Sequence, residues 1–243
     1  MRIPRLYIDL PLAAGEPVLL RKDKAHYISH VLRMKTGAAI KLFNNTGYEF
    51  DAVIVALSKK NAELEIKEKY QCDNESPLEV TLCLAISRGQ HMDYSIQKAV
   101  ELGVNTIVPV VSEFSNVKLQ ADRLDNKMTH WLNIIISAAE QCGRSRLPEL
   151  VPPVSFSDCL SLDISNPRLI LQPNSQQSLQ SIELEGNHLS MLIGPEGGFS
   201  ESEIQEACNK GAISINMGPR ILRAETAVVT ALSNAQQLWG DLK

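Results

Sequence analysis

Residues Leu192–Ser200 read LIGPEGGFS, and this stretch is the most informative part of the sequence. The apolar run that precedes it, Leu189–Ile193, predicts a buried strand, and Ser200 with Glu203 has the spacing of a helix capping box. Glycines between a strand and a helix let the backbone approach a ligand closely. Ligands of open α/β sheets lie beyond the carboxyl ends of the strands, so we expect a ligand site here. The alternative is a glycine-rich turn that binds nothing.

The glycine pattern also excludes two common kinds of site. No GK[ST] follows the loop, so it is not a phosphate-binding Walker loop, and its spacing is not the GxGxxG of dinucleotide-binding proteins. Phosphate and ordinary dinucleotide binding are therefore poorly supported.

A second segment of this kind is Met217–Ala227, which reads MGPRILRAETA. It also lies between a predicted strand and a predicted helix, with a turn at Gly218. Arg220 and Arg223 place two cations beside the first loop, and Glu225 falls in the first helical turn, where a carboxylate is favourable. An arginine that only pairs with a glutamate remains the alternative to a catalytic role.

A third polar group closes a long predicted helix, at AAEQCGRSR (Ala138–Arg146). It contains Glu140, Gln141 and Arg144 at the end of an otherwise apolar helix. A cation near a helix C-terminus is favourable by itself, so a structural role for Arg144 stays open beside a functional one.

From Leu78 onward, predicted strands alternate with predicted helices. This order indicates a parallel sheet covered on both faces. The strands are expected at Glu79–Ile86, Thr106–Val111, Arg168–Gln172, Leu189–Ile193 and Ile213–Met217, and the helices at a segment containing Met92–Val100, at Ala121–Cys142 and at Glu225–Trp239.

Residues 1–70 have a different pattern, with short runs of alternating apolar and polar residues. Strands are expected at Ala39–Phe43, Tyr48–Val55 and Ala62–Lys67, and a short helix at Ala25–Leu32. Several short strands joined by turns predict a small β-barrel. The polar stretch Gln71–Pro77 is expected to be a linker, so the predicted domains are 1–70 and 78–243.

Composition says less about the function than the motifs do. The formal net charge is -4, yet residues 1–41 carry eight Lys or Arg and three acidic residues, which is compatible with a local phosphate-binding surface. The five cysteines form no CxxC pair, and His26 and His30 have no carboxylate or cysteine nearby, so no metal is expected. No apolar run reaches membrane-spanning length, and we expect a cytoplasmic protein.

Taken together, LIGPEGGFS, MGPRILRAETA, AAEQCGR and KAVELGVNTIVP resemble the ribosomal RNA small subunit methyltransferase E family, as does the opening MRIPRLYI. That family belongs to the SPOUT class. The resemblance implies an α/β fold with an N-terminal PUA-like β-barrel for RNA, a C-terminal SPOUT α/β domain with a parallel sheet and a deep trefoil knot, and a homodimer. It further implies S-adenosylmethionine-dependent methylation of N3 of one uridine in 16S rRNA, within the small ribosomal subunit.

The resemblance also implies site residues. Arg223 would stabilise negative charge on the uracil, and Glu196 would act as base or orienter. Candidate RNA contacts are Arg2, Arg5, Arg33, Arg88 and Arg144, with Arg88 near the position where the family often carries a lysine. The cofactor would be held by Leu171, Gln172, Pro173, Gly194, Gly197, Gly198, Met217, Gly218, Ile221, Leu222 and Ala224.

Two other interpretations remain. The chain could be a non-catalytic RNA-binding protein of the same fold, although both glycine loops are present. It could also be a Rossmann-like enzyme acting on a small-molecule nucleotide, although GxGxxG is missing and the N-terminal segment is basic.

Overall fold

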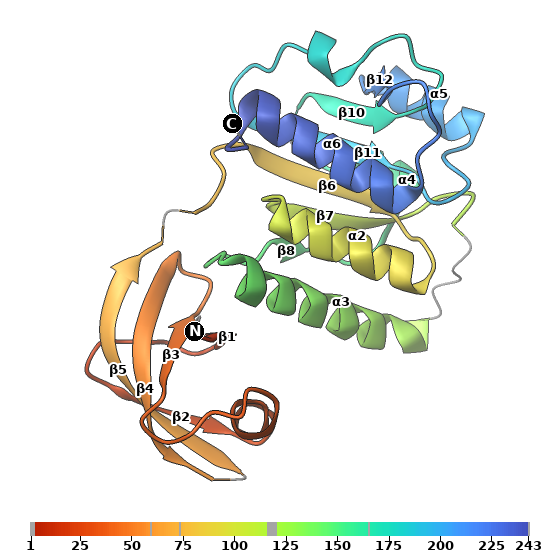
Figure 1. Cartoon of the computed structure of the whole chain (residues 1–243). Coiled ribbons are helices and arrows are strands. Elements are labelled where there is room, and N and C mark those ends of the chain that lie inside the picture. Colours follow the sequence, from red (N-terminus) through yellow and green to blue (C-terminus); the bar gives the residue numbers. More distant parts are fainter. Residues whose placement is uncertain (1–2, 59, 73, 116–120, 165, 243) are drawn as a thin grey trace. The chain divides into compact units, whose positions relative to one another are not determined.

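The computed structural model describes residues 3–58, 60–72, 74–115, 121–164 and 166–242, with side chains from residue 124 onward in the helix that starts at 121. The chain divides into two compact units (Figure 1). Unit 1 comprises Met1–Asn74 and Ala139–Leu147, and unit 2 comprises Glu75–Ala138 and Pro148–Lys243. The chain therefore passes from unit 2 into unit 1 at Ala139 and returns to unit 2 after Leu147. The sequence pattern does not reveal this.

Unit 1 contains a curled, mixed five-stranded sheet in the order β1-β3-β4-β5-β2. Only the β1–β3 pair is parallel. Within the described residues β1 and β2 are edge strands, so the small β-barrel expected from the sequence takes the form of a curled half-barrel. The strands are β1 (Arg5–Tyr7), β2 (Pro17–Arg21), β3 (Ala39–Phe43), β4 (Tyr48–Leu57) and β5 (Asn61–Gln71).

The alternation expected in β4 and β5 is confirmed. Ile54, Leu64 and Ile66 are fully buried, whereas their neighbours on the other face are more accessible. The short helix is also confirmed, as α1 (Asp23–His26) continuing into a π-helical turn, η1 (Tyr27–Val31). β1 and β2 were not anticipated, because each is too short for its alternation to stand out.

Unit 2 is built on a seven-stranded sheet in the order β12-β10-β11-β6-β7-β8, with β9 also paired to β7. Every pairing in it is parallel. The strands are β6 (Glu79–Ala85), β7 (Thr106–Val111), β8 (Glu149–Leu150), β9 (Val154–Ser155), β10 (Arg168–Leu171), β11 (His188–Ile193) and β12 (Ile213–Ile215).

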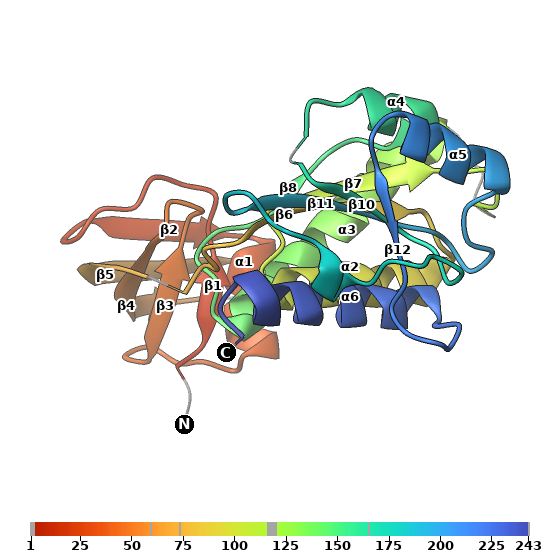
Figure 2. The ribbon, with the colours of Figure 1, turned by 90° about the horizontal axis from the view of Figure 1, so that it is seen from above.

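Helices cover both faces of this sheet, as the continuous apolar strands predict. Figure 2 shows α2, α3 and α6 on one face and α4 and α5 on the other. The bounds are α2 (Gly89–Glu101), α3 (Ala121–Cys142), α4 (Phe156–Ser161), η2, a 3-10 turn (Leu179–Ser181), α5 (Glu201–Asn209) and α6 (Ala224–Trp239). Of these, α4 and η2 were not anticipated, nor were β8 and β9; all four are very short.

Local signals set several element ends. α5 begins with the expected capping box: the Ser200 hydroxyl accepts from the Glu203 backbone N–H, and the Glu203 carboxylate accepts from the Ser200 N–H. α2 ends at Glu101, and Gly103 just beyond its C-cap Leu102 has a φ of +81°, a left-handed conformation that glycine adopts without strain. The capping box therefore sets where the loop that follows β11 ends.

Candidate active site

Three loops of unit 2 converge at one edge of its sheet. They follow β11, β10 and β12, which are neighbours in the sheet order, so their carboxyl ends lie side by side. Between the loops lies a cavity of about 440 Å³, a size typical of small-ligand sites. All eleven residues expected to hold the cofactor line this cavity: Leu171, Gln172, Pro173, Gly194, Gly197, Gly198, Met217, Gly218, Ile221, Leu222 and Ala224.

The glycines are needed for close backbone approach. A Cβ on Gly194 would lie 2.9 Å from the backbone carbon of Gly198, so even alanine would force the loop to move. A Cβ on Gly197 would lie 3.1 Å from the Cβ of Phe114. Gly198 and Gly218 have φ angles of +72° and +101°, which L side chains rarely adopt. The loop shape that forms the cavity therefore depends on these residues lacking side chains.

The walls between the glycines are mainly apolar, and several were not anticipated. These include Ile193, the last residue of β11, together with Ile204 of α5 and Ala227 of α6. The apolar pattern of their elements marks all three only as core residues. The charged side chains at the cavity are Glu196, Glu201 and Arg220. Carboxylates outnumber guanidinium groups, so the cavity is better suited to a cationic ligand than to a phosphate.

Glu196 and Arg88 come together, although they are far apart in the sequence. The Glu196 Oε1 accepts a hydrogen bond of 3.3 Å from the backbone N–H of Arg88, the N-cap residue of α2. Both side chains are exposed. The beginning of α2 therefore borders the glycine loop, which brings two of the predicted site residues to one rim.

Arg223 is the N-cap residue of α6, between Leu222 and Ala224 of the cavity wall. Its side chain is exposed and does not line the cavity. Arg223 is therefore next to cavity-wall residues in the chain, with its own side chain accessible to solvent.

A histidine–carboxylate pair next to Ala224 of the cavity wall was not anticipated. His91 Nδ1, in the first turn of α2, lies 3.1 Å from Glu225 Oε1, in the first turn of α6. Within the part of the chain that is described, the buried Oε2 of Glu225 has no hydrogen-bond partner. The pair ties the beginnings of the two helices together. Only Glu225 carried a sequence signal, as an acid at a helix N-terminus.

Glu203 supports the same loop from behind. Besides closing the capping box, its Oε1 accepts a 2.8 Å hydrogen bond from the backbone N–H of Glu113. The adjacent Phe114 packs toward Gly197. One buried carboxylate thus links the loop after β7 to the start of α5 and, through Phe114, to the glycine loop.

Comparison with known protein families matches both parts of the chain. Residues 74–236 match the RNA methyltransferase domain, and residues 20–67 match the RNA methyltransferase PUA domain. Ribosomal RNA small subunit methyltransferase E of Buchnera aphidicola subsp. Schizaphis graminum is 40% identical over 99% of this chain and 98% of its own. The chain belongs to the ribosomal RNA small subunit methyltransferase E family.

Solved structures from this family have the same fold. A methyltransferase of Legionella pneumophila in complex with the bound cofactor SAM has a TM-score of 0.97 and 38% identity, covering 100% of both chains. Ribosomal RNA small subunit methyltransferase E from Neisseria gonorrhoeae, bound to S-adenosyl methionine, has a TM-score of 0.92 and 37% identity, again over 100% of both chains.

In this member of the ribosomal RNA small subunit methyltransferase E family, the predicted RNA-contacting arginines differ in exposure. Arg5 and Arg144 are buried in unit 1, whereas Arg33 and Arg88 are exposed. Arg2 lies outside the described residues. The Arg5 guanidinium is bonded to Glu49 and to the carbonyl oxygens of the segment Ala139–Leu147, an arrangement that argues against a phosphate contact.

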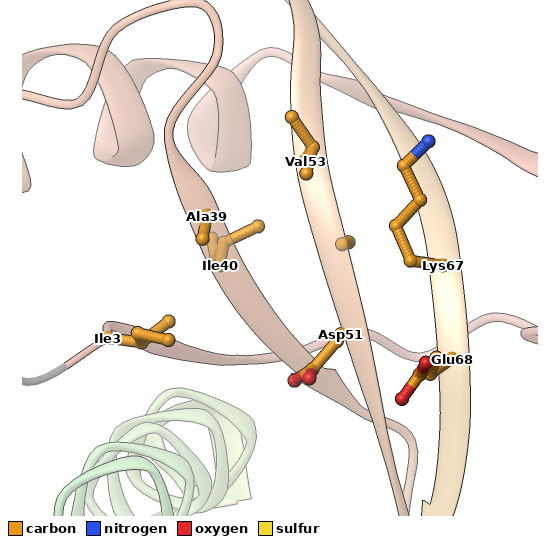
Figure 3. A pocket seen from close by; sticks show the side chains of 8 residues that line it. Ile3, Ala39, Ile40, Asp51, Val53, Lys67 and Glu68 are labelled. Atoms are coloured by element: carbon orange, nitrogen blue, oxygen red, sulfur yellow. The ribbon is translucent and has the colours of Figure 1, made fainter.

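Two other features of the described residues were considered as sites. His26 and His30 stack with ring centroids 4.3 Å apart, and the described residues contain no group of three or more His, Cys, Asp or Glu that could hold a metal. Figure 3 shows a second cavity, on the sheet of unit 1, where Asp51, Lys67 and Glu68 border apolar side chains; it contains none of the predicted site residues. Among the helices in the described part of the chain, none is both long and apolar enough to cross a membrane.

Proposed function

We propose that the chain transfers a methyl group from S-adenosylmethionine to N3 of one uridine in 16S rRNA of the small ribosomal subunit. The main support is the cavity at the ends of β10, β11 and β12, which gathers all eleven residues implied by the family resemblance. Related proteins from Legionella pneumophila and Neisseria gonorrhoeae hold this cofactor.

The cavity fits that cofactor chemically. Backbone groups of three loops, two of which contain glycine, are available for its polar parts, and Leu171, Met217 and Leu222 provide apolar contact. Glu196 and Glu201 favour a positive charge. When bound, S-adenosylmethionine supplies a methyl group activated by its sulfonium centre.

The protein must then make the uracil nucleophilic. N3 of uracil carries a proton at neutral pH, and its loss spreads negative charge over O2 and O4. A guanidinium held against these oxygens stabilises that charge, and Arg223, next to the cavity-wall residues in the chain, has this role in our proposal. Glu196 receives the proton or orients the base, through the carboxylate oxygen not bonded to Arg88.

The two units have separate tasks in this proposal. Residues 1–70 form an RNA-binding domain, residues 71–77 are a linker, and residues 78–243 form the catalytic domain. Arg33 and Arg88, both exposed, contact RNA phosphates, and the target base leaves its stack to reach the cavity. The protein acts as a cytoplasmic homodimer. The deep trefoil knot implied by the family stays a prediction.

The decisive experiment uses labelled S-adenosylmethionine and small ribosomal subunits that lack the modification, followed by mapping of the methylated base. We expect one uridine, methylated at N3. Methylation of another base or atom would refute the assignment. Binding of NAD or ATP in place of S-adenosylmethionine would favour a small-molecule enzyme, and absence of cofactor binding would favour a non-catalytic RNA-binding protein.

Arg223→Ala tests the catalytic assignment. We expect kcat to fall by a factor on the order of 100 to 1000, while calorimetric binding of S-adenosylmethionine is retained, because the side chain does not line the cavity. Lys210→Ala, which removes an exposed cation of unit 2 remote from the cavity lining, is the control and should leave kcat unchanged. Full activity of Arg223→Ala would remove this residue from the mechanism.

A further inference from the structure

Two of the three loops at the cavity are joined by a hydrogen-bond network that none of the sequence motifs contains. One loop follows β10 and spans residues 172–178, and the other follows β12 and spans residues 216–223, of which residues 216–218 take part in the network. Gln172, Met217 and Gly218 of these loops line the cavity. The network is centred on Asn216, a half-buried residue at the end of β12.

The Asn216 side chain bonds to both loops. Its Nδ2 donates to the carbonyl oxygens of Ser175, at 2.8 Å, and Gln177, at 3.1 Å. Its Oδ1 accepts from the backbone N–H of Gly218, at 3.0 Å, which closes a side-chain turn over Met217. The backbone N–H of Asn216 donates to the Gln177 oxygen as well, at 2.8 Å. A single amide therefore sets the shape of one loop and attaches it to the other.

Ser175 makes a second connection between the same segments. Its hydroxyl donates to the carbonyl oxygen of Ser214 at 2.6 Å and accepts from the backbone N–H of Gln177 at 3.2 Å. The Gln172 N–H donates to the Ile215 oxygen at 2.8 Å. The loops are thus held by polar contacts along their length, from the strand ends to the cavity.

Packing does less to hold the second loop. Met217 and Gly218 also line a separate cavity of about 270 Å³, formed with Ser178, Leu179, Gln180, Asn216 and Asn234. Residues that border a solvent-accessible cavity make fewer van der Waals contacts with the protein than residues packed on all sides. Gly218 adds freedom, because its φ of +101° is unrestrained by a side chain. Directional hydrogen bonds are consequently what selects one position for this wall.

We propose that Asn216 is a positioning residue that holds the loops after β10 and β12 in the geometry that binds S-adenosylmethionine. This inference rests on the proposed function. Without the amide, the loop after β12 samples positions in which Met217 and Gly218 no longer match the loop after β10. The apparent affinity then falls by the fraction of time that the binding geometry is lost.

Asn216→Ala is the main test, and calorimetric binding of S-adenosylmethionine to the full-length protein is the main measurement. If the variant holds the binding geometry one tenth of the time, Kd rises about tenfold. We expect the KM for S-adenosylmethionine to rise in parallel, with the KM for the RNA substrate unchanged. Hydrogen exchange of the Gly218 amide, measured without cofactor, should become faster.

Asn216→Asp separates the two halves of the contact. It keeps an acceptor for the Gly218 N–H but turns the donor toward Ser175 and Gln177 into a second acceptor, which those carbonyl oxygens repel. We expect a rise in Kd with little change in Gly218 exchange. Ser175→Ala should raise Kd in the same direction by a smaller factor.

Asn234→Ala is the matched control. Asn234 borders the same 270 Å³ cavity, but its side chain donates to the Thr230 oxygen within α6. We expect its Kd to equal that of the wild type. An unchanged Kd in Asn216→Ala and Asn216→Asp, or an equal rise in Asn234→Ala, would overturn the inference while leaving the proposed function intact. A wild-type chain that binds no S-adenosylmethionine would instead refute the proposed function.

Discussion

Arg5 shows how a charged residue can have a structural role that its sequence context does not reveal. Its Nε donates to Glu49 at 2.7 Å, and its two terminal nitrogens donate to the carbonyl oxygens of Ala139, Glu140 and Arg144 at 2.7, 3.2 and 3.0 Å. The side chains of Arg5 and Glu49 are only 6% and 8% exposed. Five N–H donors on a planar group allow one residue to satisfy all of these acceptors.

Arg5→Ala should therefore destabilise the protein. The substitution removes the nearer of the two cations at the buried Glu49 carboxylate, leaving Lys41 Nζ at 3.6 Å, and it also leaves three carbonyl oxygens without their donor. We expect the free energy of unfolding to fall by about 3 kcal/mol, measured by urea denaturation of unit 1. Arg33→Ala, at an exposed arginine, is the control and should change it by less than about 0.5 kcal/mol. Equal effects of the two substitutions would contradict the assigned role of Arg5.

Glu140 is a half-buried carboxyl in unit 1, and it makes stability depend on pH. Burial raises the pKa of its carboxyl above the ordinary value of 4.5, and the Tyr7 N–H, Lys24 and Arg5 partly oppose that rise. The folded protein therefore binds this proton more tightly than the unfolded chain does. The contribution of Glu140 is fully present below pH 4.5 and is lost as the pH rises through the folded pKa.

Glu140→Gln removes that titration and keeps an acceptor for the Tyr7 N–H, which bonds to Glu140 Oε1 at 2.9 Å in the wild type. We expect the stability of the variant relative to the wild type to increase as the pH is raised from about 4.5 to neutrality. Urea unfolding at a series of pH values would measure it. A difference that is constant with pH would show that the pKa of Glu140 is not raised.

At the scale of secondary-structure elements, α5 is the clearest case of a local signal with a distant effect. Its capping box is local, but the Glu203 carboxylate also bonds to the Glu113 N–H, 90 residues away in the chain. The capping residue Glu203 thus also supports the cavity wall, because Glu113 is followed by Phe114, which packs toward Gly197.

Glu203→Ala and Ser200→Ala distinguish these two roles. Ser200→Ala loses only the cap, and we expect a cost of about 1 kcal/mol in unfolding free energy. Glu203→Ala leaves two backbone N–H groups without a carboxylate and should cost about 3 kcal/mol. It should also weaken binding of S-adenosylmethionine, measured by calorimetry, because Phe114 is no longer held. Equal losses in both variants would mean that the bond to Glu113 contributes nothing.

At the scale of the whole molecule, the chain passes between the units more than once. Ala139–Leu147 lies between parts of unit 2 but is grouped with residues 1–74. It contributes acceptors for Arg5, the Glu140 carboxylate for the Tyr7 N–H, and the Leu147 N–H for Asn45 Oδ1. Unit 1 is therefore compact in space, but it is formed by two separate stretches of the sequence.

A fragment of residues 1–74 should consequently unfold with a lower midpoint and less cooperativity than unit 1 in the full chain. Urea denaturation followed by the near-ultraviolet signal of its tyrosines would measure the transition. The same fragment joined to residues 139–147 by a flexible linker should regain much of the loss. If the two fragments unfold alike, the segment is not needed for the stability of unit 1.

The sequence by itself determined the alternation of strands and helices in unit 2, the capping box at Ser200 and the glycine loops. These depend on local chemistry: periodicity, helix capping and the absence of a Cβ are properties of neighbouring residues. The family resemblance added the eleven cavity residues, which the structure places around one cavity.

Only the tertiary structure decided which polar groups meet. The burial of Arg5, the His91–Glu225 pair and the Asn216 network join residues that are 39 to 139 positions apart or arise from loop conformations without a motif. Hydrogen bonds between distant segments form after packing has brought those segments together, so no local pattern records them. For that reason the cavity was predictable from its glycines, but the contacts that hold its loops were not.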